Sequence, residues 1–241
     1  MLVQAIVLRS RAQKDYDRVI TCYTRELGKI EILVRSAQKL NSKLAPLTSG
    51  LYAILVLKIE PGKNYYHLLG GEVKKYFKNI LSNYRETWQV GRLLKGIDDI
   101  IKLEKPHRQI FELLVKFLEK MNVKTLRDKD ILIYAFLIKF LSLLGYQPEI
   151  KKCVFCHRSP KAGEKIYFDL AHGGTVCADC VTKKHYSSIL INEGALEIMR
   201  QLLYRCFDQL ERYPSTSLGT SKPDFRRAKV IINRFFKWHL G

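Results

Sequence analysis

Acidic residues are scarce in this sequence. Over 241 residues there are 23 Asp and Glu against 42 Lys and Arg, which gives a formal net charge of +19. Such an excess of positive charge favours polyanionic partners, nucleic acid before acidic lipid, because it raises their local concentration and their association rate. Wholesale disorder is not expected, because 47% of the residues are hydrophobic and can form packed cores.

Long hydrophobic runs are also missing. The most apolar segment, 131–144, contains Lys139 and is shorter than the roughly 18 to 20 residues that a membrane span needs. We therefore expect a buried helix there and no membrane partner. The first ten residues do not combine a basic stretch, an apolar run and a small-residue cleavage site, so we expect no secretory signal and a cytoplasmic protein.

Common catalytic signatures are absent as well. The chain contains no GxxxxGK[ST], GxSxG or HExxH pattern. Three short acidic pairs could be imagined as ligands for a nuclease magnesium, but each lies beside basic residues and none has a third carboxylate at a suitable spacing. We expect a binding protein rather than an enzyme, with a metal-dependent nuclease as an alternative. The pairs are Asp15/Asp17, Asp98/Asp99 and Asp128/Asp130.

The first third of the chain has the pattern of β-strands. Its apolar residues alternate with polar ones, and β-branched and aromatic residues are frequent. Five strands within one small domain suit a closed barrel better than an open sheet with exposed edges. We expect a five-stranded OB-type barrel over residues 1–80, with strands at 4–8, 19–24, 29–34, 51–59 and within 65–77.

Beyond residue 82 the hydrophobic spacing becomes that of α-helices. The first stripe runs from Val90 to Ile101, and the second runs from 110 to 121, with Pro106 in the first turn of that helix. A third helix, near 131–144, is apolar on nearly every side. Later in the chain we expect a helix that carries Ala195 through Cys206 to Leu210, a flexible connection at 213–223 and a basic helix at 225–239.

Four of the six cysteines form two CxxC pairs. Cys153/Cys156 and Cys177/Cys180 are separated by residues 157–176, which is a zinc-ribbon spacing. Two thiolates on one tight turn can bind the same ion, and two such turns complete the tetrahedral shell that zinc prefers. We predict one structural Zn²⁺ per chain, because a closed Cys₄ shell leaves no open position for catalysis. Redox dithiols are the alternative, and Cys22 and Cys206 are expected to be core residues.

These patterns predict an α+β protein made of four parts. The expected parts are the barrel at 1–80, a first helical part at 81–150, a Cys₄ zinc-binding module at 151–187 and a C-terminal helical part at 188–241. The zinc module is thus inserted in the helical domain.

Basic residues are dense near the start of the chain. OB-type barrels bind single strands by combining a positive groove with exposed aromatic rings on which bases stack. The aromatic candidates here are Tyr16, Tyr23, Tyr52, Tyr65 and Tyr66. The candidate nucleic-acid-binding residues are Arg9, Arg11, Lys14, Arg18, Lys29, Arg35, Lys39 and Lys43.

A second basic stretch begins at Arg205 and continues to Lys237. It could face phosphates, or it could be a solvated helix surface whose apolar side packs on other helices. A groove between these helices could also receive an acidic, hydrophobic peptide tail. The apolar side is expected to comprise Val230, Ile231, Phe235 and Trp238.

Several motifs resemble those of the RecO family of bacterial recombination mediators. They are the opening AIVLRSR, Asp17 followed by VIT, Gly28-Lys29, the basic loop 35–42, and the segments LLGYQPEIKKCVFC and YFDLAHGGTVCADC that lead into the two cysteine pairs. The resemblance covers nearly the whole chain. The chain departs from the family pattern at Ser36 and His157, where the family usually has glycine.

The resemblance implies an OB barrel, a helical domain and a zinc module. It also implies a non-enzymatic role in DNA repair and recombination: binding ssDNA and dsDNA and annealing complementary strands. The implied partners are RecR, the C-terminal tail of single-stranded DNA-binding protein and, indirectly, RecA, with nucleoid association when the protein is bound to DNA. A zinc-ribbon RNA-binding or transcription-associated protein is the alternative.

Overall fold

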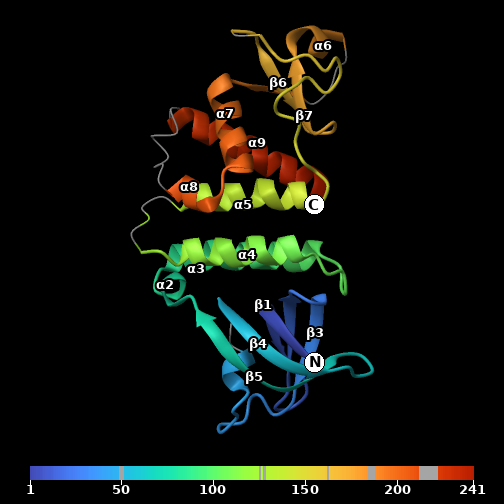
Figure 1. The fold of residues 1–241 in the computed structure, drawn as a ribbon, viewed down its shortest axis with the longest axis vertical. Helices are drawn as coiled ribbons and strands as arrows, with labels where there is room; N and C mark the ends of the chain where they lie inside the picture. The colour runs from blue at the N-terminus through green and yellow to red at the C-terminus, as the bar shows by residue number, and fades with distance from the viewer. Residues whose placement is uncertain (49–51, 125, 127–128, 162, 184–187, 212–221) are drawn as a thin grey trace. The chain divides into compact units, whose positions relative to one another are not determined.

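The computed structural model (Figure 1) describes the chain apart from residues 49–51, 125, 127–128, 162, 184–187 and 212–221. The chain forms two compact units, Met1–Lys124 and Thr125–Gly241. The first unit contains a barrel and helices, and the second contains further helices and the paired cysteines. The four-part division expected from the sequence stays a prediction.

A closed five-stranded barrel occupies the first part of unit one (Figure 1), as the alternating pattern predicted. Its strand order is β1-β2-β3-β5-β4, and neighbouring strands are antiparallel except β3 and β5. The parallel pairing of β3 with β5, at Ile32 and Tyr66, closes the sheet. The strands are β1 (Leu2–Ala12), β2 (Arg18–Thr24), β3 (Gly28–Val34), β4 (Ala53–Glu60) and β5 (Tyr66–Tyr76).

The barrel core consists of alternate residues of the strands. Along β3, Ile30, Ile32 and Val34 are buried while Glu31 and Leu33 are not, because successive side chains of a strand point to opposite faces. The outer face of the sheet is therefore available to polar residues.

The described residues of the first unit also form four helices, of which α1 lies between β3 and β4 and the other three follow the barrel. The helix α3 begins after Asn83, whose side chain accepts a hydrogen bond from the backbone amide of Glu86. The apolar stripes of α3 and α4 are buried as predicted. The prediction for Pro106 is wrong, because it precedes the N-cap residue His107 and lies outside the first turn. The helices are α1 (Ala45–Thr48), α2 (Lys78–Leu81), α3 (Tyr84–Ile100) and α4 (Arg108–Met121).

The second unit combines packed helices with a small sheet. The apolar helix α5 contacts α7, α8 and α9, which explains why nearly every side of it is hydrophobic. Its one lysine, Lys139, donates a 2.6 Å hydrogen bond to the carbonyl oxygen of Leu203, and burial lowers the pKa of its ammonium group to about 8. The helices are α5 (Asp130–Leu143), α7 (Glu193–Tyr204), α8 (Phe207–Glu211) and α9 (Lys222–Leu240).

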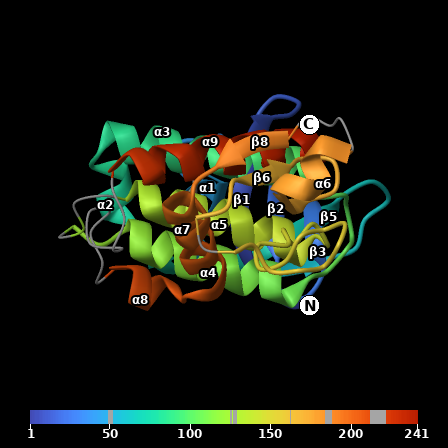
Figure 2. The same ribbon diagram turned by 90° about the horizontal axis from the view of Figure 1, so that it is seen from above.

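The segment around the cysteines forms a sheet that the sequence did not predict. It has the order β7-β6-β8, with a short helix after β7. Figure 2 shows β6, β8 and α6 toward one end of this unit and α7 and α8 toward the other. The elements are β6 (Ile166–Asp169), β7 (Gly174–Cys177), α6 (Ala178–Lys183) and β8 (Ser188–Ile191).

Three details of the second unit differ from the expectations. Cys206 is exposed between α7 and α8, because Arg205 is extended and ends α7, so its prediction as a core residue is wrong. The expected connection at 213–223 lies outside the described residues up to 221, and α9 already begins at Lys222. On α9, Val230 and Trp238 are exposed rather than packed.

None of the described helices is both long enough and apolar enough to cross a membrane.

Candidate metal centre and nucleic-acid interface

The two CxxC pairs meet at one point of the second unit. Their four sulfur atoms lie within 4.8 Å of one another, and Sγ of Cys156 is 3.7 Å from Sγ of Cys177. Zinc–sulfur bonds of about 2.3 Å in a tetrahedron place sulfur atoms about 3.8 Å apart. Cys153, Cys156, Cys177 and Cys180 therefore fit a tetrahedral ion, as their spacing predicted.

Backbone hydrogen bonds place the first pair against the sheet. The amide of Val154 donates to the carbonyl oxygen of Thr175 on β7, and the amide of Thr175 donates to Glu149. The amide of His157 donates to the carbonyl of Cys153, which closes the first tight turn. The second pair starts at the last residue of β7 and continues into α6. The strand β7 therefore sets the separation of the two pairs.

An ion-pair cluster joins the two cysteine turns. The guanidinium group of Arg158 donates to both carboxylate oxygens of Glu164 at 2.8 Å and to Asp179 on α6 at 2.8 Å. Glu164 also accepts from the backbone amides of Lys161 and Ala178. These donors lower the pKa of Glu164 to about 2, so this bridge persists through the whole neutral range.

The protonation of the thiols also fits a bound cation. Burial raises the pKa of Cys153, but hydrogen bonds from the backbone around Cys156, Cys177 and Phe155 outweigh burial and lower it to about 6. Burial and the neighbouring sulfur atoms raise the pKa of Cys180 to about 12. Four adjacent thiolates therefore need a cation to be charged together. Such a cation would be fully enclosed by sulfur, which suits a structural role.

Glu164 and Asp179 also lie within 4.8 Å of the sulfur of Cys177, but both are paired with Arg158. His172, close to the cysteines in sequence, contacts Asp169 through Nδ1 at 3.0 Å. Asp169 is fully buried and also accepts from Ser188. This contact belongs to the turn between β6 and β7, away from the group of four sulfur atoms.

Five of the predicted nucleic-acid-binding residues meet at one end of the barrel. The amide of Ser36 donates to the carboxylate of Asp17 at 2.7 Å, and the amide of Gln38 donates to the carbonyl of Tyr16. These bonds tie the loop after β3 to the turn between β1 and β2. We call this end the basic loop surface; its cations are Lys14, Arg18, Arg35, Lys39 and Lys43.

A shallow groove lies within the basic loop surface. It has a volume of about 750 Å³ and is lined by Ser10, Arg18, Gln38 and Ser42, among others. Nε of Arg18 donates to Oγ of Ser10 at 3.0 Å, which holds the guanidinium group at the groove wall. Lys14, Arg35, Lys39 and Lys43 are exposed, so their charges face solvent. The groove can therefore accept an anionic chain.

Only some of the candidate aromatic residues can stack on a base. Tyr16 is 56% exposed, and the ammonium group of Lys39 lies 5.7 Å from its ring centre. Tyr65 and Tyr66 are half-buried. Tyr23 and Tyr52 are buried, and their hydroxyl groups donate to backbone carbonyls of the helical segment, so they anchor the barrel. Tyr16 is thus the most exposed of the candidate tyrosines, and Tyr76, which is 40% exposed, lines the groove as well.

Arg9 and Arg11 lie on the outer face of β1, apart from the loops. The register aligns Arg9 with Thr21 on β2 and Glu31 on β3. Arg9 pairs with Asp98 at 3.0 Å, and both arginines lie 3.8 Å from Glu31. Their side chains stay partly exposed, so they retain some capacity to meet phosphate.

Lys29 has a different role from the other candidates. Its ammonium group lies 2.9 Å from Oδ1 of Asp98, and its hydrogens are directed to the backbone oxygens of Asp98 and Ile101. The side chain is 12% exposed. Gly28 precedes it with a φ of +72°, and a Cβ there would meet the carbonyl of Lys105. The Gly28-Lys29 motif therefore joins the barrel to the α3–α4 connection, and we leave Lys29 out of the interface.

The acidic pairs do not form a metal site in the described residues. Asp98 is 5% exposed and pairs with Arg9 and Lys29 rather than with another carboxylate around an ion. Asp17 is bonded to the loop amide of Ser36. Asp128 lies outside the described residues, and Asp130 pairs with Lys229 at 2.6 Å.

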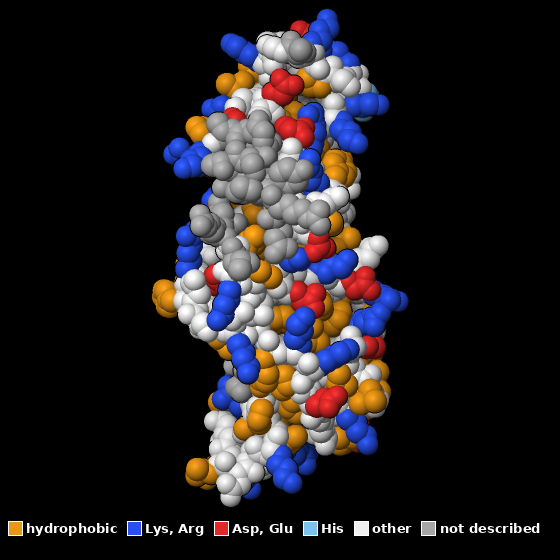
Figure 3. All heavy atoms as spheres, turned by 60° about the vertical axis from the view of Figure 1, so that its left-hand side comes forward, with side chains coloured by type: hydrophobic (Ala, Val, Ile, Leu, Met, Phe, Trp, Pro, Cys, Tyr) orange, Lys and Arg blue, Asp and Glu red, His pale blue; other side chains and the backbone are white. Residues whose placement is uncertain are grey.

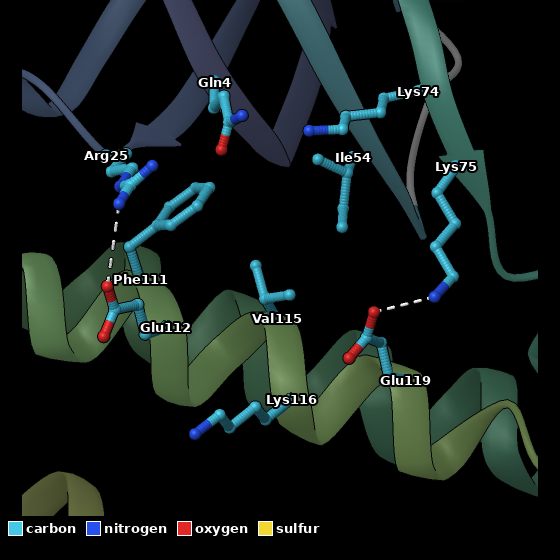
Figure 4. Close-up of a pocket in the computed structure, with 10 residues that line it drawn as sticks. All are labelled: Gln4, Arg25, Ile54, Lys74, Lys75, Phe111, Glu112, Val115, Lys116 and Glu119. Atoms are coloured by element: carbon cyan, nitrogen blue, oxygen red, sulfur yellow. Dashed lines mark hydrogen bonds and ion pairs between the residues drawn. The ribbon is translucent and has the colours of Figure 1, made fainter.

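A second groove lies between the strands and α4 (Figure 4). It has a volume of about 520 Å³ and an apolar wall that includes Phe111 and Ile54. Two of its cations are paired within it, Lys75 with Glu119 at 2.7 Å and Arg25 with Glu112 at 3.9 Å. Its lining also includes Lys74 and Lys116, so two of its four cations are not paired with the two carboxylates that line it.

The closing helix presents further positive charge. The apolar residues of α9 that face the unit interior are buried, Phe225 and Phe235 among them. Lys and Arg side chains predominate over acidic ones across the face drawn in Figure 3, in keeping with the net charge of the chain. The exposed cations of α9 include Arg226, Arg227, Arg234 and Lys237.

Two sequence profiles match this chain. The one described as Recombination protein O N terminal matches residues 1–77, and the one described as Recombination protein O C terminal matches residues 93–241. A protein named DNA repair protein RecO from Bacillus pumilus (strain SAFR-032) is 29% identical over 206 residues, covering 85% of this chain and 77% of the relative. The protein of that name from Bacillus subtilis (strain 168) is 27% identical over 239 residues, covering 99% and 89%.

Proposed function

Because this chain belongs to the recombination protein O family of DNA repair proteins, we propose that it is a DNA-binding recombination mediator that anneals complementary strands. The observation that carries the proposal is the basic loop surface, where Arg18 lines a groove bordered by the loop that carries Arg35, Lys39 and Lys43, and where the ring of Tyr16 is exposed. Single-stranded DNA would bind there through its phosphates, with a base stacked on the tyrosine.

Annealing needs no chemical step. Two DNA strands repel each other through their phosphates, and a protein that neutralises part of this charge lowers the cost of bringing them together. Base pairing then supplies the stability of the product. We propose that the protein is not an enzyme and that it binds both ssDNA and dsDNA through this electrostatic mechanism.

We propose zinc as the ion of the cysteine site. The residues that would hold it are Cys153, Cys156, Cys177 and Cys180, whose sulfur atoms fit its tetrahedral preference. When bound, zinc would join the two cysteine turns and neutralise part of the thiolate charge. Its role would be to stabilise the fold of this part of the chain. The site exists only in the folded state, so the free energy of zinc binding contributes to the free energy of folding.

We propose three protein partners on the basis of family membership. They are RecR, the C-terminal tail of single-stranded DNA-binding protein, and RecA, which would be loaded indirectly. The exposed cations of α9, together with the exposed ring of Trp238, support binding of an acidic tail with hydrophobic residues. We propose a cytoplasmic location and association with the nucleoid through DNA.

Competition between DNA and RNA tests the nucleic-acid class. We expect a labelled single-stranded DNA to be displaced at least as well by unlabelled DNA as by RNA of equal length and sequence. A strong preference for RNA would favour the zinc-ribbon RNA-binding alternative, since the same barrel and charge would serve it. Cleavage of the probe that depends on magnesium and is abolished by Asp15→Asn would favour the nuclease alternative.

A further inference from the structure

The outer face of α3 carries exposed aromatic rings. Tyr84 is 86% exposed and Trp88 is 52% exposed. The two residues are four positions apart, so they lie one turn apart on the same side of the helix. Burying a tryptophan contributes strongly to stability and to binding, so a ring left in water at this position is available to a ligand.

Positive charge lies on the same face. The guanidinium group of Arg92 lies 4.7 Å from the ring centre of Trp88, within the range of a cation–π contact. Lys95 is exposed one turn further along. Rings alternating with cations are the arrangement on which single-stranded nucleic acid binds, because its bases stack while its phosphates are neutralised. We call this face the α3 stripe; its members are Tyr84, Trp88, Arg92 and Lys95.

The stripe borders the barrel at its far end. Asp98, three residues after Lys95, pairs with Arg9 on the outer face of β1. At 1.5 Å per residue, Trp88 and Asp98 are about 15 Å apart along the helix. Arg11 continues the line on β1, where its guanidinium group lies 5.9 Å from the ring of Tyr65. The stripe therefore ends beside the part of the barrel wall that carries Arg9 and Arg11, where Asp98 and Glu31 offset part of the positive charge.

We propose that the α3 stripe is a second binding site for single-stranded nucleic acid, separate from the basic loop surface. The proposal rests on the proposed function and deepens it, since annealing requires that two strands be held close to each other. Trp, Tyr and Arg are also enriched at protein–protein interfaces, so a second copy of the chain is the other occupant that the test must distinguish.

The fluorescence of Trp88 tests the proposal. The chain has two tryptophans, so Trp238→Phe leaves Trp88 as the only one. We expect oligothymidylate to quench the emission of this variant in a saturable manner, because a stacked base quenches an indole ring. The matched control is Trp88→Phe, in which Trp238 remains and oligothymidylate should cause little quenching. Fluorescence anisotropy of labelled oligothymidylate measures total binding in parallel.

The outcomes separate this site from the proposed function. Binding by anisotropy without quenching of Trp88 would overturn the α3 site and leave the basic loop surface intact. Absence of any binding would contradict both. Emission that depends on protein concentration but not on DNA would mean that the stripe is an interface between copies of the chain, which also overturns the proposal.

An affinity measurement gives a second readout. We expect Trp88→Ala to weaken binding of oligothymidylate about tenfold, the effect of losing one stacked base. Leu103→Ala is the control, because Leu103 is 53% exposed in the same unit and is neither aromatic nor charged. Equal affinities of the Trp88→Ala variant, the Leu103→Ala variant and the unaltered protein would overturn the proposal.

Discussion

Lys29 and Asp98 form the most enclosed ion pair among the described residues of the first unit, with side chains 12% and 5% exposed. Removing one member of such a pair leaves an uncompensated charge in a region of low dielectric constant. Arg9 contacts the other carboxylate oxygen of Asp98 from a more exposed position, so it neutralises the charge of Asp98 only in part. The pair therefore stabilises the junction of the barrel and α3.

We expect Lys29→Met to lower the free energy of unfolding by about 3 kcal/mol, because the buried carboxylate loses its nearest cation. Chemical denaturation followed by circular dichroism measures this change. Lys43→Met is the control, since Lys43 is exposed and its loss should change stability by less than about 0.5 kcal/mol. Equal stability of the two variants would show that Lys29 is an ordinary surface residue.

His157 lies in the left-handed region of the backbone, with a φ of +60°. Ser36, the other position where the family usually has glycine, has a φ of +55°. Both turns therefore require a backbone conformation that glycine adopts freely and that residues with a Cβ adopt only at a cost in free energy. His157 and Ser36 thus adopt the left-handed conformation although neither is glycine.

We expect His157→Val to lower the free energy of unfolding of the second unit by about 1 to 2 kcal/mol, because β-branched residues are the least tolerant of this conformation. His157→Gly should be no less stable than the unaltered protein. Thermal unfolding of the zinc-loaded protein measures both variants. A valine variant as stable as the glycine variant would contradict the turn geometry.

The loop after β3 and the turn before β2 form the element on which the proposed function depends. We expect reversal of Arg35, Lys39 and Lys43 to Glu to weaken binding to single-stranded DNA. The slope of log affinity against log salt concentration should become shallower by about 2, because fewer counterions are released. Titrations of labelled DNA at several salt concentrations measure this slope.

Lys116→Glu provides the control for the loop variants. Lys116 is exposed on α4 beside the second groove, so its reversal changes net charge without touching the basic loop surface. An equal effect per charge for the control and the loop variants would mean that net charge acts without a specific site. An unchanged salt slope in the triple variant would remove the loop from the interface.

The cysteine turns form the second element with a testable role. We expect Cys153→Ser to lose zinc and to destabilise the second unit, because three thiolates no longer close the shell. Metal analysis should give one zinc per unaltered chain and less than one in the variant. Cys22→Ser would not be a suitable control, because Cys22 is fully buried, whereas Cys206→Ser is suitable because Cys206 is exposed. A variant with full zinc content and an unaltered melting transition would contradict the structural role.

The hydrophobic spacing of the sequence predicted those strands and helices that have one buried and one exposed face. The alternation of β3 and the stripe of α3 are visible in sequence because one face of each is buried and the other is not. The parallel closure of β3 on β5 depends on residues more than thirty positions apart, and no local spacing contains it. The short strands β6 to β8 were missed because four-residue strands carry too little periodicity.

In the candidate sites too, local spacing predicted some residues, whereas the contacts of others depend on the folded chain. The four cysteines were predicted because the CxxC spacing places two thiols on one tight turn, where both can bind the same ion. The ion pair of Lys29 could not be predicted, because its partner, Asp98, lies on a helix of the following segment and only the folded chain brings them together. The α3 stripe was missed, although Tyr84, Trp88 and Arg92 at four-residue spacing would have indicated it.

The whole molecule carries a net charge of +19, and both units contribute exposed cations. The basic loop surface belongs to the first unit, and the cations of α9 belong to the second. Distributed positive charge allows one chain to contact more than one DNA strand, and it makes that contact sensitive to salt. This property is the basis of the proposed annealing activity.

The most direct test is the rate at which two complementary labelled oligonucleotides anneal, measured with and without the protein at two salt concentrations, in the absence of nucleotide and magnesium. We expect a clear acceleration that declines as salt rises, and that is largely lost when Arg35, Lys39 and Lys43 are reversed to Glu. Tight DNA binding without any acceleration would contradict the central claim.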